Sequence, residues 1–201
     1  MLQFTPNPER ASLGFKDAVL ANFQFLQEMG FHVVQQDVTF VRFESPKVFV
    51  NVYHGRSSYE LGVEIGMHGK STRGIALGEI VAWAGALKTE GFGQHAMFQV
   101  SSREGVEQFV PKLAALVRKY GVPFLRGDSD AYREALEERS RAARDYERQA
   151  QVEGLRRRAE VAWSSRDFAG AVELYRSIGP DITQVEAKKL AYAEKKVRAL
   201  S

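Results

Sequence analysis

The sequence predicts an α+β protein, in which an antiparallel four-stranded meander packed by helices is followed by a long helix and a C-terminal helical hairpin. Three observations support this fold class. Residues 38–67 are rich in β-branched and aromatic residues that alternate with polar residues and glycine, as in a sheet with one buried face. The flanking segments carry apolar residues at three- and four-residue steps, which is typical of helices that cover such a face. From Ser129 the composition changes to Ala, Arg and Glu, with few large apolar residues.

The meander is expected to start at Phe31, to continue over Thr39–Glu44, and to have further strands from Val48 and from Tyr59, with short turns between them. Residues 96–100 are expected to form either a short additional strand or an entry segment. Alternation assigns the side chains of the last two strands to faces. On the strand from Val48, the residues Val48, Val50 and Val52 share one face. On the strand from Tyr59, one face takes Tyr59, Leu61, Val63 and Ile65, and the other takes Glu60, Gly62, Glu64 and Gly66.

Three helices are expected around this sheet. The first covers residues 12–29 and ends before Gly30, which suits a left-handed C-terminal position. The second covers residues 76–87. The third runs to residue 119 and opens with a capping box that starts at Ser101.

The C-terminal third is expected to begin with one long helix over residues 129–166, with a possible interruption at Gly154. Its apolar stripe is thin, so most of its length cannot be buried. We expect Tyr132 and Leu136 to pack on the α+β domain. The middle is then either solvent-exposed or the seam of a homodimer. We place the domain boundary near residue 127, which gives an α+β domain over 1–127 and a helical domain over 128–201.

The last part of the chain resembles a single tetratricopeptide-like helical hairpin. The pattern consists of Leu155-x3-Ala159-x2-Ala162, followed by Asp167-Phe168-x2-Ala171-x3-Tyr175-x2-Ile178. The resemblance implies that the alanines allow close helix crossing and that Phe168 and Tyr175 fill the groove between the helices. A following helix over residues 181–200 is expected to pack on this pair.

The N-terminal part is similar in pattern to small uncharacterised bacterial α+β proteins. The similarity lies in a helix, an antiparallel meander with an R-S-x-Y-E-L turn, and further helices. Some of these proteins are immunity-type proteins that neutralise toxins. The resemblance therefore implies a role in binding another protein.

Composition narrows the class of protein. The chain has no cysteine, which excludes disulfides and thiolate chemistry and fits a reducing cytoplasm. The N-terminal residues lack the pattern of a secretory signal. No window approaches eighteen consecutive apolar residues, so no membrane span is expected. The net charge is +3 and is mixed along the chain, which is typical of a solvated surface.

The most function-like group of side chains consists of His54 and Arg56, in the turn between the last two strands, and of Glu60 and Glu64, on the polar face of the last strand. The candidate binding face consists of Arg42, Tyr53, His54, Arg56, Glu60 and Glu64. If His54, Arg56 and Glu60 converge, they have the chemistry of a hydrolase or nuclease site. The alternative is a solvated face on which the glutamates form cross-strand ion pairs with Arg42.

Other chemistries have weaker sequence support. The four histidines are scattered, with no metal-ligand spacing, and no phosphate-binding loop or nucleophile elbow is present. No metal and no cofactor is therefore expected. Arg156, Arg157 and Trp163 are candidate nucleic-acid contacts, with the indole as a stacking surface. Consecutive residues on a helix point in different directions, however, and Trp163 also suits the core of the hairpin.

Together these patterns predict a cytoplasmic, non-enzymatic protein-binding module, of immunity or adaptor type. Another protein is the expected partner. The alternatives are a nucleic-acid-binding protein that uses the arginine-rich helix, and a hydrolase or nuclease that uses the His54 group. A homodimer through the long helix is a further possibility that the thin stripe leaves open.

Overall fold

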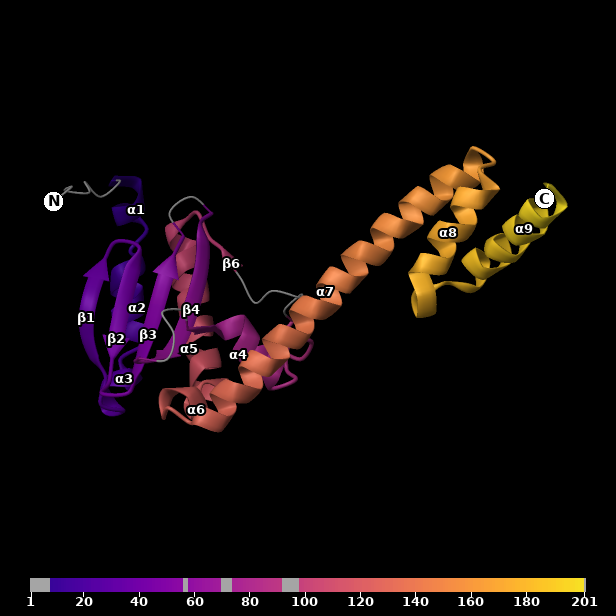
Figure 1. Ribbon diagram of the computed structural model, residues 1–201. Helices are drawn as coiled ribbons and strands as arrows, with labels where there is room; N and C mark the ends of the chain where they lie inside the picture. The colour runs from indigo at the N-terminus through magenta and orange to yellow at the C-terminus, as the bar shows by residue number, and fades with distance from the viewer. Residues whose placement is uncertain (1–7, 56–57, 70–73, 92–97, 201) are drawn as a thin grey trace. The chain divides into compact units, whose positions relative to one another are not determined.

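The computed structural model of the chain describes residues 8–55, 58–69, 74–91 and 98–200 (Figure 1). By its internal contacts the chain divides into two compact units, Met1–Arg139 and Ser140–Ser201. We refer to them as the N-terminal unit and the C-terminal unit. The boundary at residue 127 was predicted from composition and precedes the long helix, whereas the contacts divide the chain within that helix.

The predicted antiparallel meander and the α+β class are confirmed. The described part of the sheet consists of β1 (His32–Asp37), β2 (Phe40–Glu44), β3 (Val48–His54), β4 (Glu60–Met67), β5 (Ile75–Ala76) and β6 (Phe98–Gln99). The first four strands pair in sequence order, and β4 also pairs with β5 and β6, all antiparallel. The short strand considered for residues 96–100 is therefore present as β6.

One face of the sheet forms the main hydrophobic core. Val50 on β3 and Val63 on β4 are buried there, together with the alternate residues of the same strands. They pack with apolar residues of α2 (Phe15–Asn22), α4 (Leu77–Trp83) and α5 (Arg103–Tyr120). In Figure 1, α2 and α5 lie behind the strands. The other face of the sheet is therefore the one that these helices leave uncovered.

The helix expected over residues 12–29 is instead three short helices, α1 (Pro8–Ser12), α2 and α3 (Phe25–Glu28). The first break falls at Gly14, whose φ of +69° is left-handed. Gly30 has a φ of +85°, as expected for its position after the helical segment. Helix α4 ends earlier than residue 87 because Gly85 also turns left-handed, with a φ of +67°.

Helix α5 begins one residue later than predicted. Its N-cap is Ser102 rather than Ser101, and the Ser102 hydroxyl accepts a hydrogen bond from the backbone N–H of Gly105 at 3.2 Å. This bond satisfies one of the free N–H groups of the first turn.

The first turns of α7 (Ser129–Ser164) belong to the N-terminal unit, together with α6 (Val122–Leu125). Tyr132 is buried, as predicted, and its hydroxyl donates to the carbonyl of Phe124 at 3.3 Å. Leu136 was predicted to pack there too, but its side chain is 41 % exposed. The buried position is instead Ala135, because the buried face of this part of the helix consists of Ala131, Tyr132 and Ala135.

The C-terminal unit consists of the rest of α7, α8 (Phe168–Ile178), a 3-10 turn η1 (Gly179–Asp181) and α9 (Gln184–Leu200). Helix α7 continues through Gly154 without interruption. The buried centre of this unit is made of Val152, Ala159, Ala171, Tyr175 and Ile178. The predicted helical pair is therefore present. All residues of 140–151 are exposed in the single chain, which fits both alternatives given for the middle of the long helix.

Within the part of the chain that the structure describes, no helix has the combined length and hydrophobicity of a membrane span.

Candidate functional site: the outer face of the sheet

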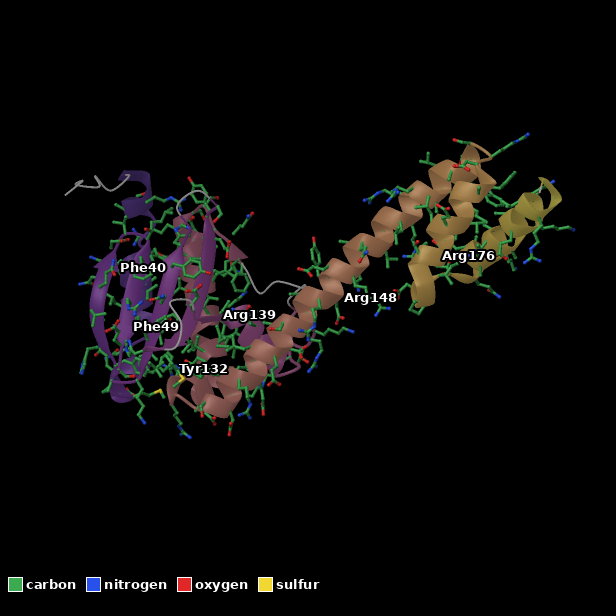
Figure 2. All side chains as sticks on the ribbon, in the orientation of Figure 1. Phe40, Phe49, Tyr132, Arg139, Arg148 and Arg176 are labelled. Atoms are coloured by element: carbon green, nitrogen blue, oxygen red, sulfur yellow. The ribbon has the colours of Figure 1, made fainter. Side chains whose placement is uncertain are left out.

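The face of the sheet opposite the core is built from three rows of residues that pair across β2, β3 and β4. We refer to it as the outer face. Because paired residues point to the same side of a sheet, the strand register defines its members. The rows are Phe40–Tyr53–Gly62, Arg42–Asn51–Glu64 and Glu44–Phe49–Gly66. Figure 2 labels Phe40 and Phe49 on this part of the sheet.

In two of these rows an aromatic ring lies over a glycine of the neighbouring strand. A Cβ atom added to Gly62 would lie 2.2 Å from Cζ of Tyr53, and one added to Gly66 would lie 2.2 Å from Cζ of Phe49. Glycine at these two positions therefore gives each ring room to lie across β4, an arrangement that stabilises glycine within strands. As a result, rings rather than backbone cover much of the outer face.

Arg42 is held in place by its neighbours in these rows. Its guanidinium carbon lies 4.2 Å from the centroid of the Phe49 ring. The same group donates to Glu44 on its own strand and, at 3.2 Å, to the side-chain oxygen of Asn51. Among the described residues Arg42 forms no ion pair with Glu60 or Glu64, the cross-strand partners considered above. Its guanidinium is paired with Glu44 instead.

Glu60 and Glu64 share the outer face of β4 and are partly buried. They lie about 13 Å apart along the strand. Within the described residues neither carboxylate has an ion-pair partner. Strands β2, β3 and β4 thus contribute three glutamates and one arginine to the outer face. Among the described residues of these three strands, acidic groups therefore outnumber basic ones on the outer face, and Glu60 and Glu64 are the two carboxylates that no described cation pairs with.

His54 does not belong to the outer face. Its register partner is Leu61, on the core side of β4, and its side chain is 1 % exposed. The Nε2–H group donates to the carbonyl of Val100 at 2.7 Å, while Arg10 donates to Nδ1 at 3.2 Å. Burial lowers the pKa of His54, and the neighbouring Arg10 charge lowers it further, against the opposing effect of the Val100 bond. His54 is thus a neutral core histidine.

The structure does not bring the proposed hydrolase group together. Glu60 precedes Leu61 and points to the face opposite His54, and Arg56 lies outside the described residues. Of the six predicted members of the binding face, the register places Arg42, Tyr53, Glu60 and Glu64 together on the outer face. In the described residues no group of three or more His, Asp or Glu side chains could hold a metal ion.

Arg10 is a residue of this region that the sequence did not indicate. It is 4 % exposed and donates to the carbonyl of Gly55 at 2.9 Å. Its guanidinium carbon also lies 3.6 Å from the centroid of the Tyr59 ring. Tyr59 itself adopts a φ of +54°, which is unusual for a bulky residue. Arg10 therefore contacts both ends of the turn that joins β3 to β4, through the backbone carbonyl of Gly55 and the ring of Tyr59.

The candidate nucleic-acid residues of the C-terminal unit do not form one surface. Arg156 is engaged within the unit, because it donates to Glu153 at 2.7 Å and to Glu186 at 2.9 Å. These bonds raise its pKa, the Glu153 bond most. Arg157 is exposed, whereas Trp163 is partly buried against the rings of Phe168 and Tyr192. Arg156 thus joins α7 to α9 through its ion pair with Glu186.

No family model, curated protein or solved structure significantly matches this chain.

Proposed function

We propose that this chain is a non-enzymatic protein-binding module and that a positively charged protein docks on its outer face. The observation that supports this proposal best is the pair of partly buried carboxylates, Glu60 and Glu64, on a sheet face that α2 and α5 leave uncovered. An immunity or adaptor role in the cytoplasm is the proposed context.

The chemistry of the outer face defines the kind of partner. Lysine or arginine side chains of a partner can approach Glu60 and Glu64, and they can also lie over the rings of Phe40 and Tyr53. A cation over an aromatic ring contributes about 0.5–1 kcal/mol at an exposed site. Complementary charge mainly raises the rate of association and selects the partner. We therefore expect salt to weaken the complex chiefly through slower association.

The face suits docking better than the sheet edge does. The edge strand β1 contains a register shift between Val33 and Gln35. Such a bulge twists the edge and interrupts the row of free backbone groups that an added strand would need. Side-chain contacts across β2, β3 and β4 are therefore the proposed mode of recognition, rather than addition of a strand.

The test is affinity purification of the tagged full-length chain from cells of its source, followed by quantitative mass spectrometry. We compare the wild type with the double variant Glu60→Lys and Glu64→Lys. The control is Glu28→Lys, a charge reversal of an exposed residue on α3. We expect a basic protein to be recovered with the wild type and the control and to be lost with the double variant.

Two results would contradict the proposal. One is a partner that the double variant retains at the wild-type level, because binding would then not use the two carboxylates. The other is a basic partner that is lost from the control as well, which would show that general charge rather than the outer face governs recovery. Circular dichroism of each variant establishes that the fold is retained.

A further inference from the structure

Helix α9 carries a basic and aromatic surface that the proposed function does not use. Tyr192 has lysines at all four neighbouring helical positions, namely Lys188, Lys189, Lys195 and Lys196. Residues three and four apart are neighbours on a helix surface, so these four lysines flank Tyr192 on the helix, and the Lys189 ammonium lies 5.5 Å from the centroid of the adjacent Trp163 ring. The Lys196 ammonium lies 5.4 Å from the centroid of the Tyr192 ring. We refer to Tyr192 and the four lysines as the α9 patch.

The ring at the centre of the α9 patch is both exposed and supported from behind. Tyr192 is 47 % exposed. Its ring makes edge contacts with Trp163 and Phe168, at centroid distances of 5.5 and 5.9 Å. Trp163 and Phe168 also contact each other at 5.8 Å. Three rings that contact one another in this way fix the plane of the exposed ring, and such a preorganised surface costs little entropy on binding.

The positive charge of the patch is not balanced within the unit. Both glutamates of α9 are already paired with arginines of other helices, Glu186 with Arg156 and Glu194 with Arg176. Lys189 is paired with Glu160 at 2.6 Å. In the described residues Lys188, Lys195 and Lys196 have no ion-pair partner. Three cations around the ring are therefore available to an anionic ligand.

The division of the chain into units strengthens this charge argument. Residues 140–201 contain 13 Lys and Arg against 9 Asp and Glu, a net charge of +4. Residues 1–139 contain 15 against 16, a net charge of −1. All of the chain's net positive charge thus belongs to the C-terminal unit, and α9 provides five of its basic residues.

We propose that the α9 patch binds single-stranded nucleic acid. In this arrangement a base stacks on the exposed face of Tyr192, and the phosphates on either side of it lie near the two lysine pairs. The pairs are about 10 Å apart along the helix, so the strand passes over the ring between them. Proteins that bind single strands combine a positive track with aromatic stacking surfaces in this way.

A single strand fits the patch better than an acidic peptide does. An acidic peptide would use the lysines, but it has no need for an exposed ring held by two others. Stacking of one base on an aromatic side chain contributes about 1–3 kcal/mol and is available to every base. A duplex would present phosphates to the lysines while keeping its bases out of reach of Tyr192.

The experiment is fluorescence anisotropy with the full-length protein and labelled 20-nucleotide single-stranded DNA and RNA of mixed sequence. A labelled polyglutamate peptide of similar length is the competing probe. Neutralising three phosphates on a single strand gives a log–log salt slope near −2, which is roughly a 20-fold loss of affinity between 50 and 200 mM salt. We expect this salt dependence with nucleic acid, and weaker binding of polyglutamate.

Two sets of variants locate the site. The triple variant Lys188→Gln, Lys195→Gln and Lys196→Gln should weaken binding at least 10-fold. Its matched control, Arg144→Gln, Arg157→Gln and Arg158→Gln, removes the same charge from exposed positions of α7 in the same unit. This control should change affinity by less than 3-fold. Tyr192→Ala should weaken binding at least 5-fold, and Tyr192→Phe should restore it because the ring is retained.

Three outcomes would overturn the inference. The first is no binding of either single strand at 50 mM salt. The second is an equal loss of affinity in the arginine control, which would show that binding uses α7 or depends only on the total positive charge of the unit. The third is polyglutamate binding as tightly as nucleic acid with the same loss on Tyr192→Ala, which would identify the patch as a peptide site. All variants keep the three contacting rings except Tyr192→Ala, for which Tyr192→Phe and the lysine variant provide independent tests.

Discussion

The contact between Phe49 and Gly66 gives the most specific stability prediction for the outer face. In Gly66→Ala the new Cβ would lie 2.2 Å from Cζ of Phe49 and 2.6 and 2.9 Å from its two Cε atoms. No side chain tolerates such distances, so the ring must leave its position. Phe49 is only 3 % exposed, with Arg42 above its ring. Displacement therefore exposes the ring to water and breaks the contact with the guanidinium.

The expected cost follows from these contacts. Exposing a buried phenylalanine costs about 1.5–3 kcal/mol. Losing the Arg42 contact adds about 0.5–1 kcal/mol. Replacing a strand glycine by alanine recovers about 0.5–1 kcal/mol through the lower entropy of the unfolded chain. We therefore predict that Gly66→Ala lowers the free energy of unfolding by about 1–3 kcal/mol.

The assay is urea denaturation followed by circular dichroism, arranged as a double-mutant cycle with Phe49→Ala. When Phe49 is already alanine, the clash is absent, so Gly66→Ala should be neutral or stabilising by about 0.5–1 kcal/mol. The difference between the two backgrounds measures the contact itself. An equal effect of Gly66→Ala in both backgrounds would refute the assignment of ring and glycine to one packed pair.

Three further predictions concern other parts of the molecule. The pKa of His54 is lowered in the folded state from its ordinary value of 6.5, so the unfolded chain binds this proton more readily, and the free energy of unfolding should be complete above about pH 6.5 and fall as the pH drops below it. In urea titrations at pH 8, 6.5 and 5.5, His54→Gln should reduce this pH dependence, and an unchanged dependence would contradict the assignment of His54 as a neutral core residue. Gly154→Ala should stabilise α7 by about 0.8–1 kcal/mol, since an added Cβ contacts nothing, and a lower melting temperature would instead indicate that another chain approaches this glycine. Residues 141–150 are all exposed, so their amides should exchange rapidly with deuterium at every protein concentration, whereas protection that grows with concentration would support the homodimer through the long helix.

Much of the sheet was predictable because alternation is a strong signal in a half-exposed antiparallel sheet. The same alternation also predicts that the side chain of His54 points to the core. Val48, Val50 and Val52 point to the core, so the next member of the series is His54, although we predicted that it lies in the turn. Extending the two-residue period by one step would have found it. Arg10 gave no such signal, because its partner lies 44 residues away in the chain.

The pairing of rings with glycines was only half visible in the sequence. Phe49 and Tyr53 are four residues apart, as are Gly62 and Gly66, but only the register of β3 on β4 places each ring over a glycine. The breaks around α2 were hidden for another reason. Short helices that pack on one surface keep a three- and four-residue apolar period, so periodicity cannot distinguish them from a single helix. Strand β5 spans two residues and is too short to have a period.

The central claim is that a basic protein docks on the outer face through Glu60 and Glu64. The most direct measurement is zero-length carbodiimide cross-linking of the captured complex, which joins a carboxylate to a lysine only when the two are in contact, followed by peptide mass spectrometry. The proposal predicts cross-linked peptides that connect Glu60 or Glu64 to lysines of the partner. Cross-links that arise only from carboxylates outside β2, β3 and β4, with Glu60 and Glu64 unmodified by the partner, would contradict it.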